Sequence, residues 1–119
     1  MASENVSRVF GIVDSGDAAA FGRLFSEGGR MVFGNGDPIH GPDRIAESVG
    51  EFFATIKGLR HAVRNEWTVG PDTIIELAVT YDRLDGKTVT VPAVTMWRAA
   101  DDGLIDDYRI YIDLAPVYA

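Results

Sequence analysis

Large apolar and polar residues alternate along residues 106–114, and this period of two predicts a strand with two different faces. The same alternation runs through residues 61–69, 73–83 and 88–98. Three groups of turn residues separate the four segments: Gly70-Pro71-Asp72, Asp85-Gly86 and Asp101-Asp102-Gly103. Successive hairpins of this kind predict an antiparallel meander.

Apolar residues at helical spacing precede the strands and predict three helices. The first covers residues 3–14, and the third begins at Pro42 and ends at Gly58. Between them, Asp17 predicts the N-cap of a short helix that Gly28-Gly29 ends, and residues 30–33 predict a short strand. The apolar stripes of the second and third helices are expected to be Phe21, Leu24 and Phe25, and Ile45, Val49, Phe52, Phe53 and Ile56.

Three helices beside a bent antiparallel sheet predict an α+β fold in a single domain over residues 1–119, shaped as a cone with a pocket inside. Alternation assigns one face of each strand to that pocket. On residues 61–69 this face carries His61, Val63, Asn65, Trp67 and Val69. On the other strands it carries Ile75, Leu77, Val79, Tyr81, Thr95, Trp97, Tyr108, Ile110 and Ile112. Pro92 indicates a bulge or an unpaired edge position.

Charge and composition narrow the function. The formal net charge of −7 argues against nucleic acid as a partner, because such a surface repels phosphate backbones. No apolar run has the length of a membrane span, and the N-terminal residues lack the pattern of a signal peptide, so we expect a cytoplasmic protein that does not bind membranes. There is no Cys, and the two His residues have no metal-binding spacing, so no metal site is expected.

Several short motifs resemble those of a known superfamily. They are Ser15-Gly16-Asp17 between the first two helices, Gly41-Pro42-Asp43-Arg44-Ile45 at the start of the third, and residues 103–113 at the end. Together with the order of elements, they resemble the nuclear transport factor 2-like (cystatin-like) superfamily, and within it the SnoaL-like polyketide cyclases and ketosteroid isomerase-like proteins. The resemblance implies a cone-shaped fold, a small hydrophobic ligand, no cofactor and a homodimer. The dimer is expected through the outer sheet face, which carries Ala78 and Tyr111 and few Lys residues.

The carboxyl groups that such enzymes use have no counterpart at the matching positions. Ketosteroid isomerases have acids where this chain has Phe33 and Thr95, and limonene epoxide hydrolases have one where it has Ile110. The resemblance therefore implies neither activity.

The candidates for acid–base catalysis are His61, Asp37 and Tyr108. His61 opens an apolar strand face, and imidazole suits proton transfer near neutrality. Asp37 lies in a Gly-rich turn near the expected mouth of the cone. Each residue also has an ordinary structural alternative: a core or rim histidine, a turn residue and a packed tyrosine. The expected substrate-binding residues are Phe33, Asn35, Tyr81, Thr95, Trp97, Ile110 and Ile112.

Two functions stay open. The first is a cofactor-free isomerase, cyclase or hydratase acting on a hydrophobic cyclic or polyketide-like compound. The second is a binding or accessory domain that holds an apolar molecule without changing it. If the strand faces were inverted, Asp82 and Asp113 would become the acids of the pocket; otherwise Asp113 is expected to form a salt bridge or a cap.

Overall fold

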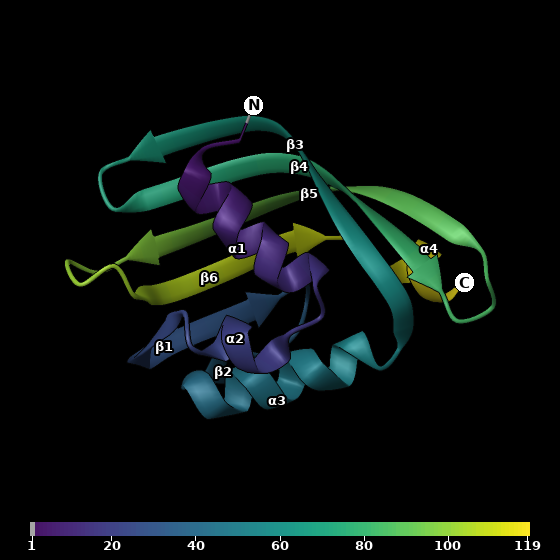
Figure 1. Ribbon diagram of the computed structural model, residues 1–119, viewed down its shortest axis with the longest axis horizontal. Helices are drawn as coiled ribbons and strands as arrows, with labels where there is room; N and C mark the ends of the chain where they lie inside the picture. Colours follow the sequence, from purple (N-terminus) through teal and green to yellow (C-terminus); the bar gives the residue numbers. More distant parts are fainter. Residues whose placement is uncertain (1) are drawn as a thin grey trace.

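The computed structural model describes residues 2–119, which form one curved sheet with helices over one of its faces (Figure 1). The helices are α1 (Glu4–Asp14), α2 (Ala18–Gly22), α3 (Pro42–Phe53) and α4 (Ala115–Tyr118). The strands are β1 (Phe25–Phe33), β2 (Ile39–His40), β3 (Ile56–Val69), β4 (Asp72–Arg83), β5 (Thr88–Ala99) and β6 (Ile105–Ile112). None of the described helices has both the length and the apolar character needed to span a membrane.

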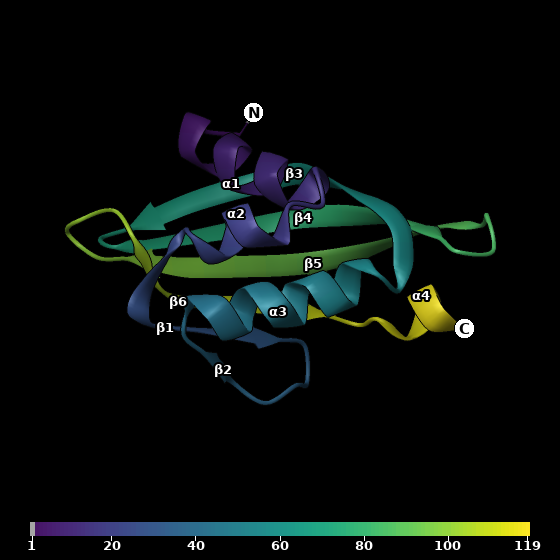
Figure 2. The same ribbon diagram turned by 60° about the horizontal axis from the view of Figure 1, so that its bottom comes forward.

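The sheet has the strand order β2-β1-β6-β5-β4-β3. From β3 to β6 it is the predicted antiparallel meander, whereas β1 runs parallel to β6, a pairing that the sequence did not reveal. Figure 2 shows α1, α2 and α3 over one side of the sheet, with β3 bending round towards the end of α3. The α+β cone is therefore confirmed, with a continuous apolar core between the helices and the inner sheet face.

Local sequence signals set the helix starts. The Ser3 side chain accepts a hydrogen bond from the backbone N–H of Val6, and Asp17 accepts one from the N–H of Ala20. Pro42 occupies the first turn of α3, where its missing N–H costs nothing. The predicted starts of the three main helices are therefore correct to within a residue.

The predicted end of the second helix is wrong. Helix α2 ends at Gly22, and β1 already begins at Phe25, so Gly28-Gly29 lies inside a strand. The pairing of β1 with β6 shifts between Phe25 and Arg30, and a Cβ on Gly29 would stand 2.8 Å from the Ile105 carbonyl oxygen. Gly29 therefore permits an irregular, closely packed strand, and neither glycine stops a helix.

The β3 strand also begins earlier than predicted. Ile56 belongs to β3 rather than to the α3 stripe, and Gly58 pairs with Asp82 inside the sheet. Helix α3 ends at Phe53, where the Ala54 and Thr55 N–H groups donate to the carbonyls of the last turn.

A β-bulge makes one predicted strand face wrong. The β3–β4 register shifts between Val63 and Asn65, so the faces exchange beyond that point. Asn65, Trp67 and Val69 consequently turn away from the face of His61, and Trp67 is 50% exposed. The predicted faces of β4, β5 and β6 are confirmed by burial, because Ile75, Leu77, Val79, Tyr81, Thr95, Trp97 and Tyr108 are all buried.

Pro92 is an edge residue, as one of the two alternatives proposed. It pairs regularly with Ala78 of β4, but pairing of β5 with β6 starts only at Ala93. Its missing N–H therefore disrupts no ladder bond to β6.

Candidate functional site

A mostly apolar cavity lies between the inner sheet face and the helices. Its volume is about 40 Å³, which is enough for roughly two or three water molecules. Its lining residues come from the last turns of α1 and α3, from helix α2, and from each of the strands β1, β3, β4, β5 and β6. The lining residues are Val13, Phe21, Met31, Phe33, Val49, Phe52, Phe53, Leu59, His61, Val79, Tyr81, Thr95, Tyr108, Ile110 and Ile112.

Seven of the ten candidate site residues line this cavity: His61, Tyr108, Phe33, Tyr81, Thr95, Ile110 and Ile112. Strand alternation brings them together, because the paired strands place Thr95 beside Ile110 and Phe33 on the far side of Ile110. The polar groups of the lining are thus one imidazole and three hydroxyls, set among phenyl and aliphatic side chains.

Three candidates lie elsewhere. Asp37 and Asn35 are exposed in the turn after β1; Asn35 borders an open groove that it shares with Asp113. Trp97 is buried but does not line the cavity. Its ring stacks on Tyr108 with a centroid distance of 5.5 Å and an interplanar angle of 4°, so it packs behind the wall. A Gly-rich turn places its side chains in solvent, which is why Asp37 does not reach the cavity.

His61 is held by a carboxylate that we did not identify from the sequence. Its Nδ1 lies 2.5 Å from Oδ1 of Asp14, and its backbone N–H donates to Oδ2 of the same side chain at 3.1 Å. Asp14 is the last residue of α1 and stands 47 positions before His61. The one signal in the sequence is its spacing, because Asp14 follows Phe10 by four residues and therefore shares its helix face.

The imidazole is fixed on a second side as well. The Phe10 ring stacks on it, with centroids 4.4 Å apart and an angle of 20° between the planes. The His61 side chain is only 10% exposed, whereas that of Asp14 is 29% exposed. In the neutral imidazole, a carboxylate at this position holds the ring proton on Nδ1, because an ionised carboxylate only accepts hydrogen bonds, and Nε2 then carries the lone pair.

Burial keeps the two tyrosines of the lining protonated. It raises the pKa of Tyr108 far above its usual range, and the negative charge of Asp14 adds to this effect. Burial likewise raises the pKa of Tyr81, with a smaller contribution from Tyr118. Both hydroxyls are therefore neutral hydrogen-bond donors, and Tyr108 is unsuited to act as a base.

The acids considered for an inverted sheet do not face the cavity. Asp82 pairs with Arg60 at 2.6 Å on the outer face, and this contact lowers the pKa of Asp82. Asp113 accepts a hydrogen bond from the N–H of Ala115, which agrees with the predicted cap. No group of three His, Cys, Asp or Glu within residues 2–119 is arranged to hold a metal ion.

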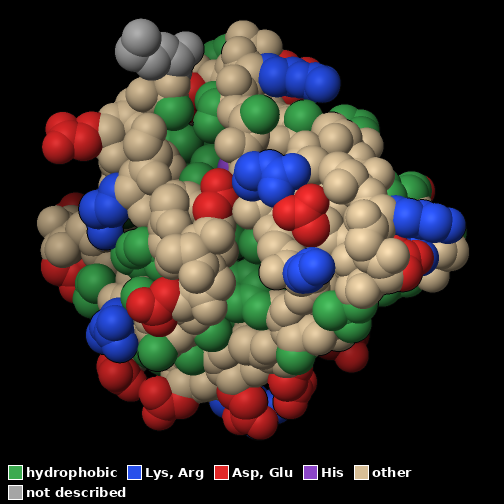
Figure 3. Space-filling model, turned by 45° about the vertical axis from the view of Figure 1, so that its right-hand side comes forward, with side chains coloured by type: hydrophobic (Ala, Val, Ile, Leu, Met, Phe, Trp, Pro, Cys, Tyr) green, Lys and Arg blue, Asp and Glu red, His purple; other side chains and the backbone are tan. Residues whose placement is uncertain are grey.

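Figure 3 shows where the molecule is hollowed on one side: hydrophobic side chains lie in a recess bordered by both basic and acidic side chains.

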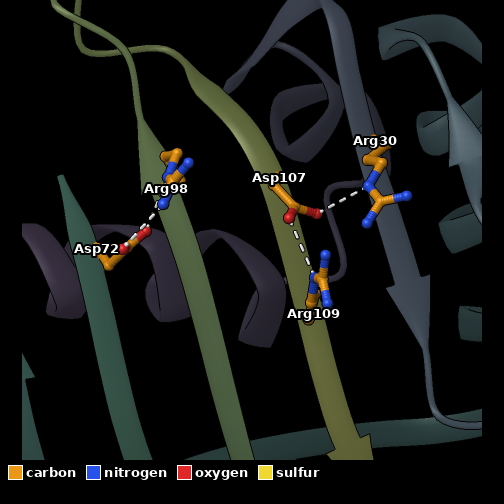
Figure 4. Close-up of polar contacts among 5 residues, drawn as sticks. All are labelled: Arg30, Asp72, Arg98, Asp107 and Arg109. Carbon is orange, nitrogen blue, oxygen red and sulfur yellow. Dashed lines mark hydrogen bonds and ion pairs between the residues drawn. The ribbon is translucent and has the colours of Figure 1, made fainter.

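The outer face of the sheet is different. There a row of charged residues crosses β1, β6, β5 and β4 near one end, with contacts of 3.0–3.2 Å (Figure 4). Its members are Arg30, Asp107, Arg109, Arg98 and Asp72.

Comparison with known proteins gives a family match over most of the chain. Residues 6–108 match the SnoaL-like domain family. No curated protein is similar enough to count as a match.

Solved structures with the same fold share little sequence with this chain. A hypothetical protein with a ketosteroid isomerase-like fold from Catenulispora acidiphila DSM 44928, in complex with trimethylamine, has a TM-score of 0.88 at 20% identity, and the match covers 98% of this chain and 91% of that one. TerC co-crystallised with polyporic acid has a TM-score of 0.81 at 18% identity, with 97% and 93% covered. The epoxide hydrolase/cyclase-like enzyme SalBIII, which has a role in pyran ring formation in the polyether salinomycin, has a TM-score of 0.80 at 19% identity. The match covers 93% of this chain and 89% of that one.

Proposed function

The chain belongs to the SnoaL-like domain family, and from this premise we propose that it is a cofactor-free enzyme that moves a proton on a small hydrophobic cyclic compound. The family includes polyketide cyclases and isomerases, so the proposal selects among reactions that this fold supports. The observation that carries it is the Asp14–His61 pair at the cavity wall.

His61 is the proposed general base. With its Nδ1–H held by Asp14, the lone pair of Nε2 is available to remove a proton, and the nearby negative charge stabilises the imidazolium that results. General-base assistance of this kind contributes about 10²–10⁴ in rate. Tyr108 then serves as a neutral donor to an oxygen of the substrate, while Thr95 and Tyr81 orient the molecule.

The lining also limits the ligand. It contains no Lys or Arg, so a buried carboxylate or phosphate would have no cationic partner, and the part of the ligand inside the cavity is expected to carry no negative charge. Two structural relatives contain small molecules, namely trimethylamine and polyporic acid, which supports a small-molecule ligand for this chain as well.

The second candidate function is binding without chemistry. It is favoured by one observation: no carboxyl group lines the cavity, because Asp14 reaches it only through the imidazole. A ligand-binding domain needs only the apolar walls and the hydroxyls.

A general probe of proton abstraction distinguishes the two functions. When a base removes the carbon-bound proton of the isoxazole ring of 5-nitrobenzisoxazole, the C–H electron pair forms the third C–N bond of a nitrile. The N–O bond breaks with its electrons going to oxygen, which gives a coloured phenolate. We expect turnover by the unchanged protein, and a loss of about 10²–10⁴ in His61→Gln. His40→Gln is the matched control, since this second histidine is exposed and lies outside the cavity. Equal rates in all three proteins would exclude His61 as a base and leave the binding function.

We also propose a homodimer through the outer sheet face. That face exposes Trp67, Val94 and Tyr111 by 50%, 36% and 52%. Tyr111→Glu would bury a charge in such an interface and should give a monomer in light scattering at micromolar concentration. Leu84→Glu, on the β4–β5 hairpin, should leave the dimer intact. A monomer before any substitution would contradict the proposal. The cytoplasmic location and the lack of nucleic-acid binding stay predictions.

A further inference from the structure

The cavity is too small for the ligand class proposed above. Its volume of about 40 Å³ is roughly a quarter of the ~150 Å³ that an apolar cavity needs to hold benzene. A cyclic ligand can therefore enter only if a side chain of the wall moves. The question is which one.

Burial separates the lining residues into two groups. Tyr81, Tyr108 and Phe21 are buried, and Tyr108 is additionally held between Trp97 and Phe25. Phe33, Phe52 and Phe53 are only partly buried; Phe33 lies on β1 within the sheet, whereas Phe52 and Phe53 belong to the last turn of α3. A partly buried ring at a helix end moves into solvent at less cost than a buried ring inside the sheet.

Of these two rings, Phe52 is the one that bridges the cavity. Its centroid lies 4.9 Å from that of Phe33 on β1 and 6.1 Å from that of Tyr81 on β4. Because β6 and β5 lie between those two strands, a ring that contacts both residues spans the concave face. Phe53 has one ring partner among the described residues, which is Phe52 itself.

Hydrogen bonds fix the backbone of Phe52, whereas its phenyl ring has no hydrogen-bonding group. The carbonyl of Phe52 accepts hydrogen bonds from the N–H and the hydroxyl of Thr55, at 2.9 and 2.7 Å. The Thr55 hydroxyl is in turn 2.8 Å from that of Tyr118 on α4. The movement is thus expected to be a side-chain rotation rather than an unwinding of α3.

We propose that Phe52 is the residue that determines ligand size: its ring occupies the space that a ligand ring takes, and it must swing out for the ligand to bind. This inference builds on the proposed function only through the cavity. It requires that the cavity binds an apolar ring, and it does not require proton transfer by His61.

Binding of two uncharged probes, phenol with one ring and 2-naphthol with two, tests the proposal. Titrations followed by amide NMR shifts of His61 and Tyr81 report binding at this cavity. Phe52→Ala removes a group of benzene size, so we expect it to bind 2-naphthol about tenfold more tightly than the unchanged protein. The gain arises because the variant no longer has to move a half-buried phenyl ring into solvent when the ligand binds. The gain for phenol should be smaller.

A milder variant and a control keep the test decisive if Phe52→Ala folds poorly. Phe52→Leu should give a smaller gain in the same direction. Leu24→Ala truncates a buried apolar side chain outside the lining and should leave both affinities unchanged. Equal affinities in Phe52→Leu and the unchanged protein, or a gain with Phe53→Ala alone, would overturn the proposal. Loss of 5-nitrobenzisoxazole turnover without any change in these affinities would affect only the proposed function.

Discussion

Asp14→Asn is the sharpest test of the site, because it alters the hydrogen bonds of the carboxylate while keeping its shape. Asp14 accepts from both the ring Nδ1–H and the backbone N–H of His61. Asparagine has one oxygen and one NH₂ group, so one of these two donors must face another donor. If the NH₂ group faces the ring, the ring proton moves to Nε2, and Nε2 no longer has a lone pair with which to act as a base.

The magnitude follows from the geometry. Hydrogen bonds to a charged group contribute about 1.5–3 kcal/mol, and because Asp14 is 29% exposed we discount that range for solvent screening to about 1–2 kcal/mol. For a domain of this size such a loss lowers Tm by roughly 4–8 °C. Turnover of the benzisoxazole probe should fall nearly as far as in His61→Gln, about 10²–10⁴.

Nitrogen-15 NMR of the imidazole is the assay that isolates the mechanism. The ring shifts distinguish Nδ1–H from Nε2–H, so the unchanged protein should show the first form and Asp14→Asn the second. Thermal unfolding and probe turnover complete the measurement. A persistent Nδ1–H signal in Asp14→Asn, with unchanged Tm, would refute the role assigned to Asp14.

Two further predictions concern the fold. Gly22→Ala should destabilise the protein, because a Cβ there would stand 2.8 Å from both the Pro42 carbonyl oxygen and the Ala46 Cβ. At Gly11 a Cβ would meet open space, so Gly11→Ala should stabilise α1 by about 0.5–1 kcal/mol. Denaturant titration compares the stability of the two variants. Arg60 lowers the pKa of Asp82 in the folded protein. The ionised Asp82 therefore stabilises the fold at pH values above its unfolded pKa, near 4, and this stability is lost as the pH falls through the lower folded pKa. Asp82→Asn should thus reduce the difference in urea midpoint between pH 6 and pH 2.

The sequence predicted best what a local period encodes. Residues 72–83 of β4, 88–98 of β5 and 107–112 of β6 pair with one another without a register shift, so their inner faces could be assigned from residue types alone. The bulge after Val63 inserts one residue without any Gly or Pro to announce it, and it reversed the face assigned to Trp67. The parallel pairing of β1 with β6 joins residues far apart in the sequence, such as Phe25 and Ile105, and no local pattern encodes it.

The candidate site divides in the same way. His61 and Tyr108 could be assigned to the cavity because alternation fixes where they point. Asp14 could not, because its contact with His61 exists only after α1 packs across β3. Phe52 was expected to pack in the core, and nothing in a helical stripe distinguishes a core ring from one that closes a cavity.

The position of the carboxylate limits the chemistry that this site can perform. At the positions where the resemblance to ketosteroid isomerases and limonene epoxide hydrolases implies a carboxyl group, this chain has Ile110, Phe33 and Thr95, all in the cavity wall. The carboxylate of Asp14 instead contacts Nδ1 of His61, so Nε2 is the ring atom left for the proton transfer of the proposed function. A neutral imidazole removes protons whose conjugate base is stabilised nearby, and the Tyr108 hydroxyl, kept protonated by burial, is the donor available to stabilise an oxyanion. Under the proposed function, the substrate that fits both groups therefore carries an acidic C–H next to a carbonyl, on an uncharged ring.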